Sequence, residues 1–132
     1  MFGIFKKKDS DKEEVRAAIK QEFGEIIAAA RVAPLSKQAR VGKGMNDAFS
    51  VFDQEHTKKS FQDLTFPERR AFLDILAKRQ EELRLKGGDV AIEHLGYSLV
   101  MKWMIAVAMG DDELVKHFDD NMIYFKRAAQ TL

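Results

Sequence analysis

Hydrophobic residues recur at helical spacing in five segments of the chain. The first segment, at about residues 10–32, has one apolar helical face, formed by Val15, Ile19, Phe23, Ile26 and Ala30. Ser10 or Asp11 is positioned to cap its N-terminus. Pro34 ends it, because the residue before a proline is disfavoured in the helical conformation.

The second segment has a weaker pattern. A short apolar stripe, made of Met45, Ala48, Phe49 and Phe52, predicts a helix at about residues 46–59. Gly42 and Gly44 disfavour a helix upstream of it, because glycine costs about 1 kcal/mol relative to alanine within a helix. We therefore expect at most one earlier turn, near residues 36–41.

The third segment has the clearest start. Residues 65–68, with the sequence Thr-Phe-Pro-Glu, form a capping box in which the proline occupies the first turn of the helix. Phe72, Ile75, Leu76 and Leu83 line one face of the predicted helix. The pair Gly87 and Gly88 ends it, as a C-terminal glycine cap does.

The fourth segment, at about residues 89–109, is apolar on nearly every side. Asp89 is its predicted cap and Gly110 its end, and from Leu99 onward it carries Leu99, Val100, Met101, Trp103, Met104, Ile105, Val107 and Met109. A helix that is apolar all round must be surrounded by protein. Either the other helices of the chain enclose it, or a partner covers part of it.

The fifth predicted helix begins at Asp111 or Asp112, and its apolar face consists of Leu114, Phe118, Met122, Phe125 and Ala129. The connections between the five segments are short, which favours antiparallel neighbours. The predicted fold is all-α: a compact four- or five-helix bundle with the helix at about 89–109 in its centre. We expect one helical domain over residues 1–132, with residues 1–9 either frayed or packed on the bundle.

Composition and charge exclude several classes of protein. The 132 residues include no cysteine, so disulfides and thiolate chemistry are absent. The net charge is +1, divided into +4 over residues 1–86 and −3 over residues 87–132, an asymmetry too mild to predict nucleic-acid binding. Residues 1–8 place apolar side chains before lysines, the reverse of a secretory signal, and we therefore predict a cytoplasmic protein.

No pattern of catalytic or metal-binding residues emerges. His94, Ser98 and Lys102 form a polar stripe, but a serine–lysine pair of the β-lactamase type is spaced by three residues rather than four, and we interpret the stripe as a solvated face. The acidic clusters at 111–113 and 119–120 fit a helix start and an exposed face. We predict a protein that is not an enzyme and needs no metal or cofactor.

Two segments suggest weaker alternatives. The stretch from residue 26 to residue 46 lacks acidic residues and contains Arg31, Lys37, Arg40 and Lys43, which favours either a mobile connector or a basic patch for an acidic protein or a nucleic-acid backbone. Phe2, Ile4, Phe5 and the lysines at 6–8 would form only a weak membrane anchor. Binding to nucleic acid and to membranes is therefore disfavoured.

The leading hypothesis is a protein–protein interaction module, such as a small adaptor, an inhibitor or an immunity-type factor. Its partner would be another protein or a second copy in a homodimer, and its predicted contact residues are Met101, Trp103, Met104 and Phe125, with Arg40 and Lys43 as a charged rim. The first alternative is a bundle that holds a small ligand or cofactor in a cavity lined by His94, Tyr97, Trp103 and Met104. The second is a nucleic-acid-associated factor that uses residues 31–43.

Overall fold

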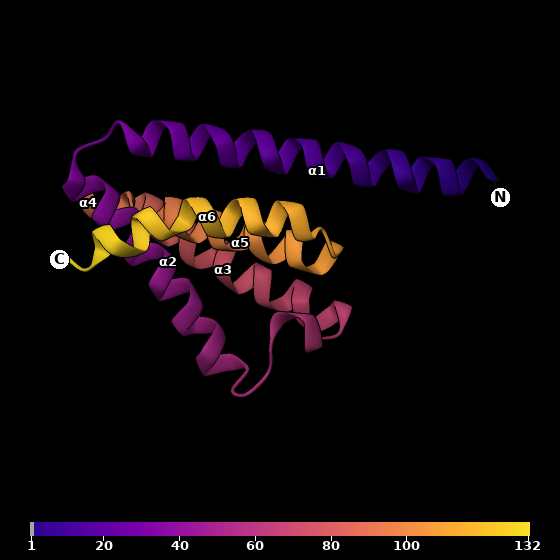
Figure 1. Ribbon diagram of the computed structural model, residues 1–132. Coiled ribbons are helices and arrows are strands. Elements are labelled where there is room, and N and C mark those ends of the chain that lie inside the picture. Colours follow the sequence, from indigo (N-terminus) through magenta and orange to yellow (C-terminus); the bar gives the residue numbers. More distant parts are fainter. Residues whose placement is uncertain (1) are drawn as a thin grey trace.

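Helices account for nearly all of the chain in the computed structural model, which describes the backbone of residues 2–132 and the side chains of residues 12–132 (Figure 1). Over these residues the elements are α1 (Phe2–Arg31), α2 (Leu35–Glu55), the 3₁₀ turn η1 (Phe61–Asp63), α3 (Phe66–Lys86), α4 (Gly88–Ala91), α5 (His94–Met109) and α6 (Asp112–Ala129). The described backbone contains no strand. The all-α prediction is confirmed.

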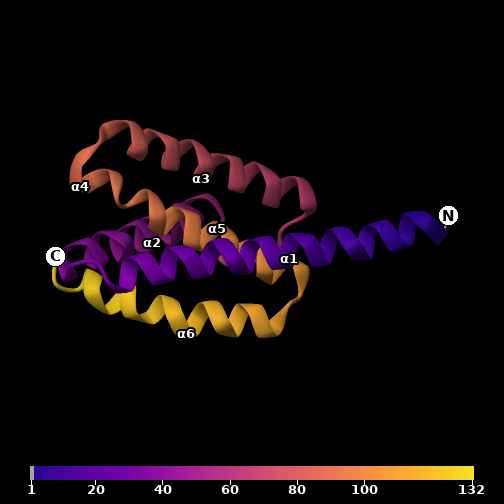
Figure 2. The ribbon, with the colours of Figure 1, turned by 90° about the horizontal axis from the view of Figure 1, so that it is seen from above.

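Helix α5 lies at the centre of the bundle and contacts α1, α2, α3, α6 and η1. Seen from above, α3 and α6 flank it on opposite sides and α1 crosses over it (Figure 2). Helix α2 packs against both α5 and α6. This arrangement confirms the predicted central place of the apolar helix. It also explains why that helix is apolar on nearly every side, because other helices pack against it on several sides.

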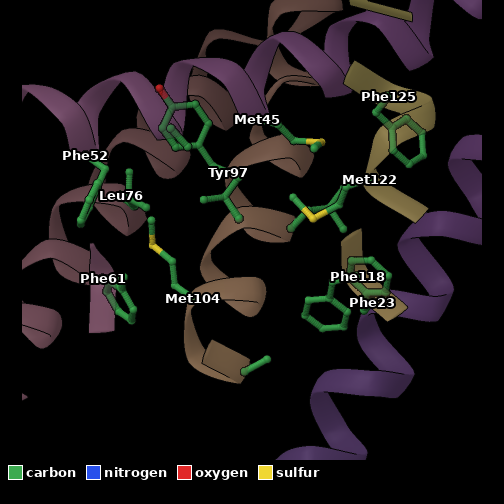
Figure 3. Packing of buried hydrophobic residues seen from close by; sticks show 14 of the residues in the cluster. Phe23, Met45, Phe52, Phe61, Leu76, Tyr97, Met104, Phe118, Met122 and Phe125 are labelled. Atoms are coloured by element: carbon green, nitrogen blue, oxygen red, sulfur yellow. The ribbon is translucent and has the colours of Figure 1, made fainter. Parts of the chain in front are cut away.

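The core combines aliphatic side chains with aromatic and methionine side chains of different helices (Figure 3). Phe23 of α1 stacks on Phe118 of α6, with ring centroids 3.8 Å apart. Phe52 of α2 meets Phe72 of α3 edge to face at 5.1 Å. Complete burial of each such side chain stabilises the fold by about 1.5–3 kcal/mol, so these contacts hold the outer helices on the bundle.

Three glycines allow the backbones of α2, α5 and α6 to touch. A Cβ atom on Gly42 would lie 1.9 Å from the carbonyl oxygen of Phe125, and one on Gly44 would lie 2.0 Å from that of Glu93. A Cβ atom on Gly96 would lie 2.2 Å from the carbonyl oxygen of Val41. The prediction that the second helix starts near residue 46 is therefore wrong: α2 begins at Leu35, because tight packing outweighs the low helix propensity of its glycines.

Helix α1 is longer than its sequence pattern predicted. It begins at Phe2 rather than near Ser10, so Ser10 and Asp11 lie inside the helix and residues 2–9 belong to it. The apolar stripe that defined the prediction covers only the part that packs on the bundle. The N-terminal part of α1 projects beyond the other helices (Figures 1 and 2).

The predicted helix at 89–109 is two helices. Helix α4 ends at Ala91, and α5 begins at His94 after a tight turn in which the amides of Leu95 and Gly96 bond to carbonyls three residues back. Asp89 lies in the first turn of α4 and is not its cap. The glycine stops are as predicted, since Gly87, Gly88 and Gly110 all have φ between 67° and 70°.

Candidate functional site

The two halves of α5 differ in exposure. In the N-terminal half, Tyr97, Leu99 and Val100 are buried by the surrounding helices. From Met101 onward, Met104 is buried but Ala108 is exposed, and five larger apolar side chains are only half-buried, namely Met101, Trp103, Ile105, Val107 and Met109. The described part of the chain therefore does not enclose the whole apolar segment.

A first apolar groove, the aromatic groove, opens between α2, η1 and the C-terminal half of α5. Its cavity volume is 390 Å³, and it is lined by Phe49, Phe52, Ser60, Phe61, Gln62, Trp103, Met104 and Val107. The indole N–H of Trp103 donates a hydrogen bond to Asp119 at 2.9 Å, and its ring meets Phe49 edge to face at 5.7 Å. These contacts fix the indole at one side of the groove.

A second groove, the basic groove, opens between η1, α3, α5 and α1. Its cavity volume is 420 Å³, and it is lined by Lys12, Phe61, Phe66, Arg69, Arg70, Leu73, Ile105, Ala108 and Met109. Phe66 is 74% exposed. Phe61 lines both grooves, so the two hollows flank a single aromatic side chain beside the open half of α5.

Two adjacent capping motifs, at the starts of η1 and α3, fix the backbone of the segment between the two grooves. At η1, the backbone N–H and the hydroxyl of Ser60 donate to Asp63 at 3.2 and 2.9 Å, which lowers the pKa of that carboxyl group. At the start of α3, hydrogen bonds from Thr65 lower the pKa of Glu68 in the same way. Both motifs are encoded locally, and together they fix where Phe61 and Phe66 lie.

Arg69 joins η1 to α3. Its guanidinium donates to the carbonyl oxygen of Phe61 at 3.1 Å and to that of Gln62 at 2.8 Å, and it lies 5.7 Å from the centre of the Phe61 ring. The side chain thereby places a fixed positive charge beside the apolar lining of the basic groove.

The predicted contact residues lie in three different places. Met104 and Phe125 are each 1% exposed and belong to the core, although Met104 also forms part of the aromatic groove. Met101, at the middle of α5, and Trp103, on its open half, are both half-buried. Arg40 and Lys43 lie on α2 and line neither groove, so they do not form the rim of this surface.

Arg40 and Lys43 instead surround a buried carboxylate. The side chain of Glu93 is 4% exposed, and its two oxygens lie 3.0 Å from Arg40 and 3.2 Å from Lys43. Lys43 also pairs with Asp47 at 2.8 Å, and hydrogen bonds from its ammonium to Asp47 and Glu93 raise the pKa of that group. Burial of a carboxylate is tolerated here because two cations and their hydrogen bonds compensate it.

The basic segment at 31–43 is therefore not a mobile connector. Most of it belongs to α2, and Arg31, at the end of α1, donates to Asn121 at 2.9 Å and lies 4.9 Å from the ring centre of Tyr124. Arg31, Arg40 and Lys43 all contact groups within the protein, whereas Lys37 is exposed and pairs with no carboxylate of residues 12–132; binding of this segment to a nucleic-acid backbone stays a prediction.

The stripe of His94, Ser98 and Lys102 is not solvated as predicted. Ser98 is 7% exposed, and its hydroxyl accepts a hydrogen bond of 2.8 Å from the Lys102 ammonium, which also lies 3.4 Å from Glu22 of α1. Burial, together with the nearby Arg84, lowers the pKa of His94. Ser98 lines neither groove, and we interpret its contact as one that positions Lys102, whose pair with Glu22 links α5 to α1.

Two findings concern metal binding and membrane insertion. Among side chains 12–132, no group of three or more histidines and carboxylates is placed to hold a metal ion. Gly88–Met109 is long and apolar enough to cross a membrane by length and composition alone, a test that the central helix of a bundle also passes. The side chains of the predicted membrane anchor, residues 2–8, lie outside the described part.

Sequence reasoning missed the residues that line the basic groove. Phe61 lies in a connection without periodicity, and Phe66, Arg69 and Arg70 lie outside the predicted apolar stripe of α3, so no helical face linked them to α5. The one available signal was the capping box at Thr65, which places Phe66 at the first position of α3. No family model matches the chain, and none of the curated proteins or solved structures compared with it is significantly similar.

Proposed function

We propose that this protein is a non-enzymatic protein–protein interaction module, a small adaptor, inhibitor or immunity-type factor, which binds another protein over the C-terminal half of α5. The observation that carries this proposal is the partial exposure of that half between two apolar grooves. An apolar patch with hollows on both sides is typical of a surface that a partner covers.

The residues at this surface are those that contribute most to protein interfaces. Trp103 and Phe66 are large and rigid, and Met109 adapts to different partner shapes. Hollows of this size accept single aromatic or branched side chains of a partner, and filling them removes apolar surface from water on both sides.

The direct test compares two variants in which an alanine is replaced by glutamine. Ala108→Gln adds a polar side chain inside the basic groove, whereas Ala77→Gln makes the same change at an exposed position of α3 that lines neither groove. Both variants and the wild type are used to capture proteins from the native host's lysate, with quantitative mass spectrometry. We expect one partner to be retained by the wild type and Ala77→Gln, and roughly tenfold less of it by Ala108→Gln.

Sedimentation of the purified protein separates a foreign partner from a second copy. Concentration-dependent dimerisation that Ala108→Gln abolishes would assign the surface to self-association. A monomeric protein whose captured proteins are the same for all three forms would contradict the proposal.

A second candidate function is supported by the aromatic groove. Its lining is largely apolar, and Trp103 and Met104, two of the four residues predicted to line a ligand cavity, lie in it, whereas Tyr97 and His94 do not. A small apolar ligand there would contact Trp103, the only tryptophan. Titration with an apolar compound should then shift the tryptophan emission and raise the melting temperature; an unchanged emission spectrum would argue against this function.

A further inference from the structure

The basic groove combines an apolar lining with positive charge from two helices. Phe66, Ile105 and Met109 supply apolar surface from α3 and α5, while Lys12 of α1 and Arg69 and Arg70 of α3 supply the charge. Among residues 12–132, none that lines it is acidic. The aromatic groove, by contrast, is lined by uncharged residues alone.

The two arginines play different parts. Arg69 is held by the carbonyl oxygens of Phe61 and Gln62, so its charge is fixed in position. Arg70 is exposed, and it makes no ion pair with any side chain in the range 12–132. No carboxylate of residues 12–132 therefore competes for its guanidinium with a carboxylate that approaches the groove.

We infer that the basic groove binds an acidic amphipathic helix of a partner protein, whose apolar side chains enter the groove while its flanking Asp and Glu residues meet Lys12, Arg69 and Arg70. This inference rests on the proposed function and deepens it by naming the partner's chemistry. Apolar anchors at helical spacing between carboxylates match a hollow that is apolar inside and positive at its edges.

Among residues 12–132, a second copy of the chain does not offer this kind of helix. Helix α6 is acidic at Asp112, Glu113, Asp119 and Asp120, but its apolar face is buried in its own core. A flat anionic membrane fits less well than a helix, because the apolar lining is concave and protruding side chains are needed to fill it. The occupant to which the groove conforms is therefore a helix from a different protein.

The test uses the full chain and a labelled peptide of about 18 residues, with leucines at intervals of three and four and glutamates elsewhere. Binding is measured by fluorescence anisotropy. Arg70→Glu reverses a charge of the groove, and Arg79→Glu makes the same change half a turn round α3, on the opposite face. We expect saturable binding that weakens about tenfold in Arg70→Glu, is unchanged in Arg79→Glu, and declines as salt is raised.

Several results would overturn the inference. Equal binding by Arg70→Glu and the wild type, or equal binding of a peptide with lysines in place of the glutamates, would remove the role of charge. Absence of binding to the acidic peptide, with Arg70-dependent binding to phosphatidylglycerol vesicles, would assign the groove to lipid. Circular dichroism of both variants checks that they fold.

The inference and the proposed function can fail separately. A captured partner that is lost with Ala108→Gln but retained by Arg70→Glu would leave the interaction surface in place and refute the acidic-helix assignment. A partner retained by both variants would refute the proposed function itself. If the partner is lost with Ala108→Gln and with Arg70→Glu, but retained by Ala77→Gln and Arg79→Glu, the result supports the proposed function and the acidic-helix inference together.

Discussion

The guanidinium of Arg40 lies 3.0 Å from a carboxylate oxygen of Glu93, and through this contact α2 holds the turn between α4 and α5. The contact lies beside Gly44, where the backbones of the same two segments touch. The carboxylate is almost fully buried, whereas the cations around it are partly exposed. Loss of a cation therefore affects the fold more than an ordinary surface ion pair would.

The first prediction concerns Arg40. Arg40→Met removes one of the two cations from a buried carboxylate and should lower the free energy of unfolding by about 2–3 kcal/mol. Urea denaturation followed by circular dichroism measures the change. Arg79→Met, at an exposed position of α3, serves as the control and should alter stability by less than about 0.5 kcal/mol. If the free energy of unfolding fell by a similar amount in both variants, the contact of Arg40 with Glu93 would contribute no more to stability than an exposed side chain does.

The second prediction contrasts two glycines within helices. Gly44→Ala would place a Cβ atom 2.0 Å from a backbone oxygen of Glu93, so α2 and α5 must separate, at a cost of about 3 kcal/mol or more. Gly24→Ala in α1 meets nothing within 4 Å and should stabilise the protein by about 0.5–1 kcal/mol. Melting temperatures that move in the same direction for both variants would contradict the close approach of the helices.

The third prediction concerns the attachment of α1. Phe23 is fully buried and stacks on Phe118, so Phe23→Ala should cost about 3–5 kcal/mol if α1 is part of the cooperative fold. Hydrogen exchange shows where in the protein this stability is lost. We expect the protection of the backbone amides of α1 to fall more than that of the other helices. Unchanged exchange in α1 would mean that the helix is not held on the bundle by this contact.

The fourth prediction concerns pH. Hydrogen bonds from Arg16 and from the backbone N–H of Leu114 keep the pKa of Asp111 below its ordinary value of 3.8. The stabilisation by Asp111 is therefore fully present above that value and is lost as pH falls through the lower, folded-state pKa.

Asp111→Asn keeps a capping group but removes the charge, and it should destabilise the protein at pH 7 by about 1 kcal/mol. The difference from the wild type should shrink below about pH 4. Unfolding curves measured at several pH values check this trend. A difference that is constant down to pH 2 would argue against the Arg16 pair.

The fold class was predictable because most helices bury a single face. In α1, α3 and α6 the stripes that include Phe23, Phe72 and Phe118 mark the faces found in the core, but two details of the α1 stripe are wrong: Val15 is 45% exposed, and Ile27 rather than Ile26 is buried. The capping box at Thr65 and the glycine stop at Gly110 are local signals, and both lie where predicted. The extent of α2 was not predictable. A glycine stabilises the packing of two helices only where another backbone lies against it, and the sequence does not show which backbone that is.

The candidate site was less accessible to sequence reasoning. Periodicity indicated that α5 is apolar all round, but not which half its neighbours would leave open. That depends on the path of the connection between α2 and α3, which brings Phe61 beside α5 and has no repeating pattern. Met104 and Phe125 were candidates for a surface because they are large and apolar, and the same property placed them in the core.

The contact of bare backbones at Gly42, Gly44 and Gly96 also has an evolutionary consequence. A side chain at any of these positions would force two helices apart, whereas the surrounding apolar positions tolerate exchanges of similar volume. Descendants of a common ancestor can therefore diverge widely in their core and still share these three glycines. Distant relatives should be recognised more readily by this spacing of glycines than by overall identity.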